Sequence, residues 1–368
     1  MRKTSDVKKG KVNDLEPAKE VFECIPREEG IELLCNYPIH IRECCYDEVK
    51  EVYILAIDVN LNVIRRVDYV ILNKQFEFVE VLQEEYGNTS PNFLVSSDKT
   101  VWVSVFSIAH DYTKEIVLPI WDRSRIKKVK SQNIIPWEQT ISWKNNLWGI
   151  GYNYCFRLDS LLRFQFDEND LYKKRDIIKT EITQESVLVV YGDKFYIHNV
   201  VVEKSKRILR LTQIGEDGDV IEHWEMVLPE QIQLIHPISN EKEGYSFVAY
   251  DNVENQLREV AFDEEGEYIS DELICSFTDE VKPEKLVKVR QDVTGACLLI
   301  FKSNKGYGFV RWHGGEKQIG IVGEGSLNMV NENSELKIVS DTEKSFIVVS
   351  APNMGFNKEK SAWILKGM

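Results

Sequence analysis

An aromatic residue returns about once every fifty positions along this chain, each time inside a short apolar run that follows a polar turn. The spacing between consecutive members is 45 to 54 residues, by subtraction of their positions. The members are Tyr53, Trp102, Trp148, Tyr196, Phe247, Phe301 and Phe346. A period in this range, with strand patterning inside each unit, is typical of a β-propeller. The sequence therefore predicts an all-β ring of seven units.

Polar turns repeat with the same period and give a second marker. Each unit is expected to contain a hairpin after its third strand, and the spacing between the expected turn centres is 45 to 50 residues. These centres are Asn73, Arg123, Glu168, Asp217, Glu265 and Gly314. Asp and Gly suit tight turns, because Asp bonds to nearby backbone amides and Gly tolerates a positive φ. Two markers that share a period support the repeat more firmly than one.

The fourth and fifth units show the strand pattern most clearly. Both alternate Val, Ile, Tyr, Phe and Thr with polar residues, as half-buried strands do. The expected strands of the fourth unit are Val187 to Tyr191, Phe195 to Val202, Ile208 to Ile214 and Val220 to Val227, with a turn at Gly192 and Asp193. Those of the fifth unit are Ile232 to Ile238, Tyr245 to Tyr250, Leu257 to Phe262 and Tyr268 to Ser276.

The last unit lacks a fourth strand. Its strands are expected near Leu336 to Ser340, Phe346 to Ser350 and Ala362 to Lys366, and the chain stops at Met368. An open ring would expose unpaired backbone groups, which folds usually cover. We therefore expect Ile31 to Cys35 to pair inside the last blade and close the ring. Residues 1–20 are expected to be a polar tail, and residues 21–368 a single propeller domain.

This layout resembles the seven-bladed propellers, such as the WD40-type and kelch-type repeat proteins. The resemblance covers about residues 30–368 and concerns architecture, because the repeat motifs of these families are missing. A Trp-Asp dipeptide occurs once, at Trp121 and Asp122, and the only Gly-Gly pair is Gly314 and Gly315.

Charge and composition limit the classes of partner and the compartment. The net charge of −14 opposes general nucleic-acid binding, which needs a positive field. No apolar stretch approaches the roughly 20 residues of a membrane helix or forms an export signal near the start. Seven scattered cysteines without an export signal indicate reduced thiols. We therefore expect a cytoplasmic protein that binds neither nucleic acid nor membrane.

The metal-binding residue types show no recognisable ligand pattern. Four cysteines, Cys24, Cys35, Cys44 and Cys45, are separated by 11, 9 and 1 residues, whereas zinc sites usually present pairs two to four residues apart. The acidic turns lack the terminal glutamate of a calcium loop and are expected to be solvated hairpin tips. We expect no metal and no cofactor.

The histidines are not spaced as a ligand pair either. His198 and His236 fall in expected strands, where a hydrogen-bonded structural histidine is the usual finding, and His110 and His313 fall in expected turns. Because a propeller can bring residues of separate blades together in its channel, scattered histidines leave a metal site possible.

Motifs for nucleophilic catalysis are also missing. The chain has no Gly-x-Ser-x-Gly elbow and no phosphate-binding glycine loop. Hydrolytic propellers use carboxylates contributed by different blades, so the missing motifs weaken an enzyme hypothesis without excluding it. We expect no identifiable catalytic residue.

Aromatic and apolar residues on expected loops are the remaining candidates for a site. Trp137 follows Pro136 in an expected loop between two blades, and Tyr112 lies in the loop between the second and third strands of its blade. Met354 and Phe356 lie in the corresponding loop of the last blade. Exposed aromatic residues on loops are frequent recognition anchors. These four residues define an expected partner-binding surface on one face of the ring.

These observations favour a non-enzymatic interaction or scaffold propeller that displays loops to a protein partner. An alternative is a propeller enzyme, a hydrolase or lyase that acts on a carbohydrate or small molecule at the central channel. A third hypothesis is a subunit of a larger assembly that is inactive alone. Convergent carboxylates in the channel would favour the enzyme.

Overall fold

The fold was analysed in a computed structural model that describes most of the strands and part of the connections. The described residues are 21–27, 30–60, 65–83, 91–95, 99–106, 114–121, 127–130, 137–144, 146–151, 154–158, 176–178, 186–216, 219–238, 244–263, 265, 267–278, 282–291, 297–303, 306–313, 316–321, 334–341, 345–350 and 360–365. Within these ranges the regular structure consists of β-strands, with no helix. None of them therefore provides a helix that could span a membrane.

The described strands form seven antiparallel sheets, numbered here in chain order. Sheet 1 contains β3 (Ile39–Asp47), β4 (Val52–Asn60), β5 (Arg65–Asn73) and β6 (Phe78–Gln83). Sheet 2 contains β7 (Pro91–Val95), β8 (Val101–Phe106), β9 (Lys114–Pro119) and β10 (Lys127–Lys130). Sheet 3 contains β11 (Trp137–Trp143), β12 (Asn146–Gly151), β13 (Tyr154–Leu158) and β14 (Asp176–Ile178).

The other four sheets follow the same up-and-down order, except for the last. Sheet 4 contains β15 (Val187–Tyr191), β16 (Lys194–Glu203), β17 (Lys206–Ile214) and β18 (Val220–Val227). Sheet 5 contains β19 (Ile232–Ile238), β20 (Tyr245–Asp251), β21 (Gln256–Phe262) and β22 (Tyr268–Ser276). Sheet 6 contains β23 (Pro283–Gln291), β24 (Cys297–Ser303), β25 (Gly306–His313) and β26 (Glu316–Ile321). Sheet 7 contains β27 (Glu335–Ser340), β28 (Ser345–Ser350) and β29 (Ser361–Leu365), followed by β2 (Gly30–Cys35) and β1 (Phe22–Pro26).

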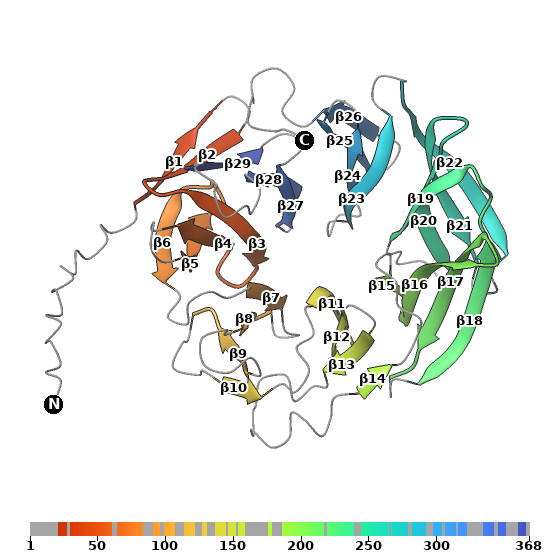
Figure 1. The fold of residues 1–368 in the computed structure, drawn as a ribbon, viewed down its shortest axis with the longest axis horizontal. Coiled ribbons are helices and arrows are strands. Elements are labelled where there is room, and N and C mark those ends of the chain that lie inside the picture. Colours follow the sequence, from red (N-terminus) through yellow and green to blue (C-terminus); the bar gives the residue numbers. More distant parts are fainter. Residues whose placement is uncertain are drawn as a thin grey trace, which may run out of the picture.

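The sheets stand around a common centre, with the first strand of each sheet innermost and the last strand in the sheet order at the outside (Figure 1). The first strands β3, β7, β11, β15, β19, β23 and β27 contact one another in that order, and β27 contacts β3. Each sheet therefore presents its two faces to the sheets before and after it, and the apolar core lies in these seams.

Strand β2 joins the two ends of the chain. It pairs with β29 from Gly30–Leu365 to Leu34–Ser361. Gly30 permits this approach, because a Cβ atom built there would lie 2.2 Å from the carbonyl oxygen of Ile364. Strand β1, which the sequence pattern did not predict, pairs outside β2 and gives sheet 7 a fifth strand.

The seven periodic aromatic residues all lie on the second strand of their sheets, and all are buried. They do not all point the same way. Tyr53, Phe247 and Phe301 pack into the seam with the preceding sheet. Trp148, Tyr196 and Phe346 pack into the seam with the following sheet. A shift of one residue along a strand moves a side chain to the opposite face, so the period locates the strand but not the face.

Strands flank every turn position expected from the sequence. Asn73 closes β5, and Glu265 lies between β21 and β22. Gly192, with φ of 56°, and Asp193 form the expected turn between β15 and β16. Arg123, Glu168, Asp217 and Gly314 lie outside the described residues.

Candidate functional site

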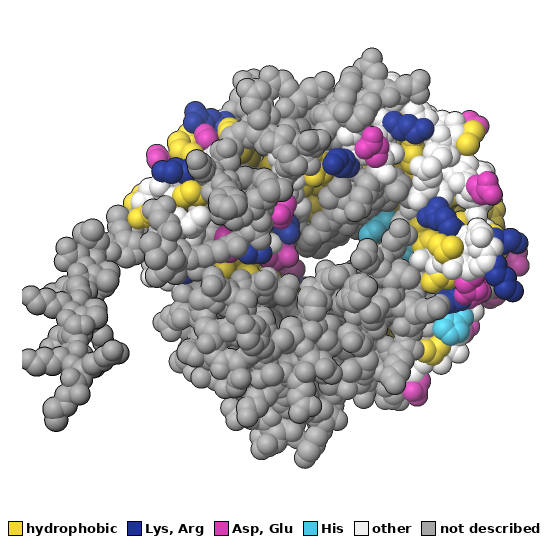
Figure 2. Space-filling model, viewed as in Figure 1, with side chains coloured by type: hydrophobic (Ala, Val, Ile, Leu, Met, Phe, Trp, Pro, Cys, Tyr) yellow, Lys and Arg dark blue, Asp and Glu magenta, His cyan; other side chains and the backbone are white. Residues whose placement is uncertain are grey.

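Polar residues gather where the first strands begin and the second strands end. His40 pairs with Asp58, Glu335 with Ser350, and Val187 with His198 at this end of their sheets. Because the same unit repeats around the axis, the first strands begin at one common end of the ring. We call this end the polar rim. Figure 2 shows a hollow at the middle of the ring, with acidic, basic and histidine side chains beside it.

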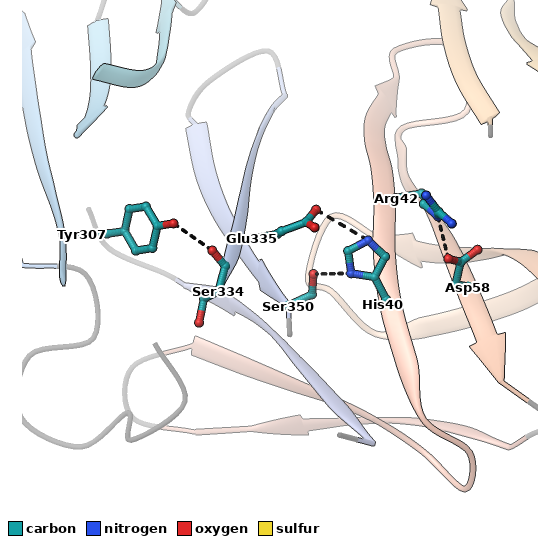
Figure 3. Close-up of polar contacts among 7 residues, drawn as sticks. All are labelled: His40, Arg42, Asp58, Tyr307, Ser334, Glu335 and Ser350. Carbon is teal, nitrogen blue, oxygen red and sulfur yellow. Dashed lines mark hydrogen bonds and ion pairs between the residues drawn. The ribbon is translucent and has the colours of Figure 1, made fainter. Parts of the chain in front are cut away.

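His40 on β3 crosses the seam between sheets 1 and 7. Its Nε2 atom lies 3.5 Å from Oε2 of Glu335 on β27, and its Nδ1 atom lies 3.4 Å from Oγ of Ser350 on β28 (Figure 3). The His40 side chain is buried, whereas 39% of the Glu335 side chain is exposed. The seam thus places a carboxylate that solvent can reach against a buried imidazole and a buried hydroxyl group.

Two arginine–aspartate pairs neutralise the buried carboxylates beside this group. Arg42 donates from Nε to Oδ2 of Asp58 at 2.5 Å. Arg66 donates to both carboxylate oxygens of Asp68, at 2.7 and 2.9 Å. Both aspartates are buried, so each needs a partner to offset the loss of water around its charge. Their charges are compensated within sheet 1, whereas the Glu335 carboxylate belongs to sheet 7 and is partly exposed.

Tyr307 on β25 brings sheet 6 into the same region. Its hydroxyl group donates to the backbone carbonyl of Ser334 at 2.9 Å (Figure 3). Burial raises the pKa of the Tyr307 hydroxyl, and the negative charge of Glu335 raises that pKa further. The Glu335 carboxylate therefore has the His40 imidazole of sheet 1 beside it, and the Tyr307 phenol of sheet 6 is bound to the backbone of the preceding residue.

The four residues expected to form a partner-binding surface do not belong to this group of polar residues. Trp137 was expected in a loop and is instead the first residue of β11, paired with Gly151. Trp137 continues the strand pattern in which Ile141 and Trp143 alternate with polar residues, so it belongs to the strand rather than to the loop before it. Tyr112, Met354 and Phe356 lie outside the described residues. The sequence analysis assigned no role to His40, Glu335 or Ser350, since they belong to ordinary strand patterns and are brought together only by the meeting of sheets 1 and 7.

The expectation of a hydrogen-bonded structural histidine is wrong for His198. Its side chain is buried, and neither ring nitrogen has a hydrogen-bond partner. Burial, and to a lesser extent the charge of His236, lowers the pKa of His198 to about 3. Burial also lowers the pKa of the partly exposed His236 to about 4. His313 ends β25 and His110 lies outside the described residues.

Metal-ligating residues do not converge in the part of the chain that is described, where no group of three or more His, Cys, Asp or Glu side chains could hold an ion. The described acidic turns have local roles. Glu216 pairs with Lys144 at 2.7 Å, and Oδ1 of Asp263 accepts a hydrogen bond from the backbone amide of Glu267. The third acidic turn expected from the sequence, Asp167 to Asp170, lies outside the described residues.

The fold resembles known structures, although no protein-family model and no curated protein matches the chain. The β-propeller domain of the Trilobed protease from Pyrococcus furiosus, described as having an open velcro topology, matches 90% of this chain and 94% of its own, with 11% identity and a TM-score of 0.50. A puromycin-hydrolyzing peptidase from Mycobacterium tuberculosis matches 93% of this chain, with 7% identity and a TM-score of 0.50. Prolyl oligopeptidase B from Galerina marginata matches 85%, with 10% identity and a TM-score of 0.53.

These similarities identify the class of fold. The protein is an all-β chain with the β-propeller fold, and the WD40 or kelch character expected from the layout is not supported specifically. The chain spans about half the length of these last two chains, since the matches cover 53% and 47% of them. At this level of identity the likeness concerns architecture, so function has to be argued from the site.

Proposed function

We propose that the protein is a propeller enzyme of the hydrolase class whose site is the polar rim at sheets 7 and 1. The observation that carries this proposal is the half-exposed Glu335 carboxylate, which lies 3.5 Å from the buried His40 imidazole. A carboxylate that solvent can reach and that is held by a second titratable group can act as a general base. The similarity to peptidase propellers supports an amide or peptide as the substrate class.

In this proposal Glu335 accepts a proton from a water molecule, and the water oxygen attacks the carbonyl carbon of the substrate. The proton then passes to the leaving amine, so the step consumes one water and restores the carboxylate. Water is the proposed nucleophile because the hydroxyl group of Ser350 is buried, with 3% exposure of the residue. His40 and Ser350 act as positioning residues that fix the carboxylate.

The ring itself is part of the proposal. We infer that the seven sheets are the blades of one closed seven-bladed propeller, with β2 completing the last blade. The pairing of β2 with β29 and the contact between β27 and β3 support this closure. A closed ring matters for the site, because Glu335 and His40 belong to the two blades that meet at the closing seam.

Substitution of Glu335 tests the catalytic assignment. Purified wild-type protein is expected to hydrolyse some members of a panel of chromogenic peptide amides, and Glu335→Gln is expected to lower kcat/KM by about 100-fold or more. His40→Gln is expected to lower kcat/KM by a smaller factor and to shift the pH profile of kcat/KM. Glu222→Gln, on the exposed strand β18, is the matched control and keeps full activity. The proposal fails if no amide is cleaved or if Glu335→Gln is as active as the control.

A second candidate function is a cytoplasmic interaction module, either alone or as a subunit of a larger assembly. One observation favours it: Trp137 begins β11, so it lies at the polar rim, and Ser350 ends β28 directly before the connection that carries Met354 and Phe356. The loop residues chosen from the sequence would then share a face with the polar rim. Alanine substitution of Trp137 and Phe356 should reduce capture of a protein partner more than tenfold while the fold survives. Unchanged capture would mean that the wrong face was chosen.

A further inference from the structure

Within the described residues, the outer strand of sheet 5 is longer than the outer strands of sheets 1 to 4 and 6. Strand β22 has nine residues, against eight in β18, six in β6 and β26, four in β10 and three in β14. It is the last strand of its sheet, and no described strand pairs with its outer side. Such an edge presents unpaired backbone N–H and C=O groups to any extended chain that approaches.

Apolar side chains on β22 are exposed beside this edge. Tyr268 is 60% exposed, Ile269 58% and Leu273 47%. Proteins usually protect such edges with lysine, proline or a bulge. Strand β22 contains neither lysine nor proline, and its register shifts lie on either side of the regular pairing from Ser270 to Leu273. Between these two shifts, Ser270 to Leu273 keep a regular register with β21.

Acidic side chains give the surroundings of this edge a negative charge. Asp271 and Glu272 lie on β22 itself, and Glu267 and Glu265 precede the strand and are exposed. Arg258 of the neighbouring strand forms an ion pair with Asp271 at 2.8 Å, so the positive charge of Arg258 is already paired within the sheet. Figure 2 shows hydrophobic and charged side chains interspersed over the outer strands of this side of the ring.

The chain itself shows that a blade can carry an added strand. In sheet 7, β1 pairs outside β2 along its whole length, from Phe22–Cys35 to Pro26–Ile31 (Figure 1). That sheet has five strands, whereas sheet 5 has four. A fifth antiparallel strand on an outer edge is therefore compatible with the packing of the ring.

We propose that β22 binds an extended segment of a protein partner as a fifth antiparallel strand, and that basic and apolar side chains alternate along this segment. Backbone hydrogen bonds to β22 supply the affinity, as in other cases of strand addition. The apolar side chains cover Ile269 and Leu273, and the basic side chains lie against Glu272 and Glu267. This edge is separate from the polar rim, so the proposal does not depend on the proposed hydrolase activity.

A synthetic nine-residue peptide of alternating lysine and valine, carrying a fluorophore, tests the proposal by fluorescence anisotropy. Wild-type protein is expected to bind this peptide. The double variant Ile269→Lys, Leu273→Lys is expected to bind at least tenfold more weakly, because the new lysines repel the lysines of the peptide and remove the apolar contacts of its valines. The matched control is Phe78→Lys, Val79→Lys on the outer strand β6, where both residues are also exposed. The control should bind within twofold of wild type. A thermal melt checks that both variants remain folded.

A second peptide separates strand pairing from simple charge attraction. It has the same lysines but proline in place of every second valine, and proline cannot donate a backbone hydrogen bond. We expect it not to bind, and we expect the lysine–valine peptide to slow hydrogen exchange in β22. Equal binding of both peptides, equal loss in both protein variants, or no binding by wild type would overturn the proposal. A wild-type dimer that the β22 variant abolishes would also overturn it, since the occupant would then be a second copy of the chain.

Discussion

Two seams of the ring use different interactions to hold neighbouring sheets together. At the seam of sheets 7 and 1, the core includes apolar residues of β1 and β2, and polar side chains cross from one sheet to the other. The hydroxyl group of Tyr53 donates to Oδ2 of Asp341 at 2.5 Å, and His40 contacts Glu335 and Ser350. At the seam of sheets 4 and 5, aromatic rings dominate, with Tyr196, Trp224 and Tyr245 packed together.

The same pair of seams contains two buried histidines with opposite environments. His40 has a carboxylate and a hydroxyl group beside its ring, whereas neither nitrogen of His198 has a partner. Directional polar contacts fix the orientation of two surfaces more strictly than apolar packing does. The seam formed by chain segments far apart in sequence therefore has the more specific contacts, and it also contains the candidate site.

Among the changes that distinguish the two seams, removal of β1 and β2 should have the largest effect. Deletion of residues 1–38 removes β1 and β2, including the buried Ile31 and Leu33, and exposes the edge of β29. We expect unfolding or aggregation, because the ring would lose one side of a seam and gain an open edge. Circular dichroism and sedimentation measure both outcomes.

Deletion of residues 1–20 is the matched control, since it leaves β1 and β2 intact. Its melting temperature should equal that of the full chain. A stable, monomeric protein that lacks residues 1–38 would show that the seam of sheets 7 and 1 does not need β2, and the closed ring would then be wrong.

The strand order was predictable because it depends on local patterns. Alternation of apolar and polar residues predicted the bounds of β15, β18, β19 and β22 as the structure has them. The period predicted the strand that carries each aromatic residue, but Tyr53 and Tyr196 face opposite neighbours. The face depends on bulges and turn lengths, which shift the register by one residue and leave little trace in composition.

The candidate site was much less predictable than the strands. Glu335 and His40 are 295 positions apart, and their contact follows from the meeting of sheets 7 and 1 rather than from any local motif. The unpartnered state of His198 was equally hidden, because a strand pattern fixes burial without showing what its neighbours offer. The aromatic criterion chose Trp137, which proved to belong to a strand.

Acid should weaken the seam of sheets 4 and 5 through His198. Its folded-state pKa of about 3 lies below the ordinary value of 6.5, so the unfolded chain takes up the proton first as the pH falls. The contribution of His198 to stability is therefore fully present above pH 6.5 and is lost progressively between pH 6.5 and 3. At about 1.4 kcal/mol per pKa unit, His198 should lower the free energy of unfolding by about 3 kcal/mol at pH 4.5 relative to pH 7.5.

Urea unfolding of wild type and His198→Leu at the two pH values measures this contribution. The variant should be at least as stable as wild type at pH 7.5, because leucine leaves no buried nitrogen without a partner. It should lose about 3 kcal/mol less than wild type at pH 4.5, while His236 continues to contribute to the remaining loss. Equal acid sensitivity in both proteins would mean that His198 is solvated or partnered in solution.

A pair of tyrosine substitutions should give the smallest effects and the most direct comparison of the two seams. Tyr53 donates to a buried carboxylate of sheet 7, whereas Tyr191 donates to the backbone carbonyl of Ser246 in sheet 5 at 2.7 Å. Hydrogen bonds to charged groups contribute about 1.5–3 kcal/mol and neutral ones about 1 kcal/mol. We therefore expect Tyr53→Phe to reduce the free energy of unfolding by about 2 kcal/mol and Tyr191→Phe by about 1 kcal/mol.

Urea unfolding at pH 7.5 distinguishes these values, and Asp341→Asn completes a double-mutant cycle with Tyr53→Phe. The cycle should give a coupling energy of at least about 1 kcal/mol, because the donor and the charged acceptor lie in one buried contact. If the two tyrosine variants lose the same free energy and the cycle shows no coupling, the charge of Asp341 adds nothing to its seam. Aromatic packing would then hold both seams in the same way, and the polar contacts of His40 and Glu335 would have to be explained by the site alone.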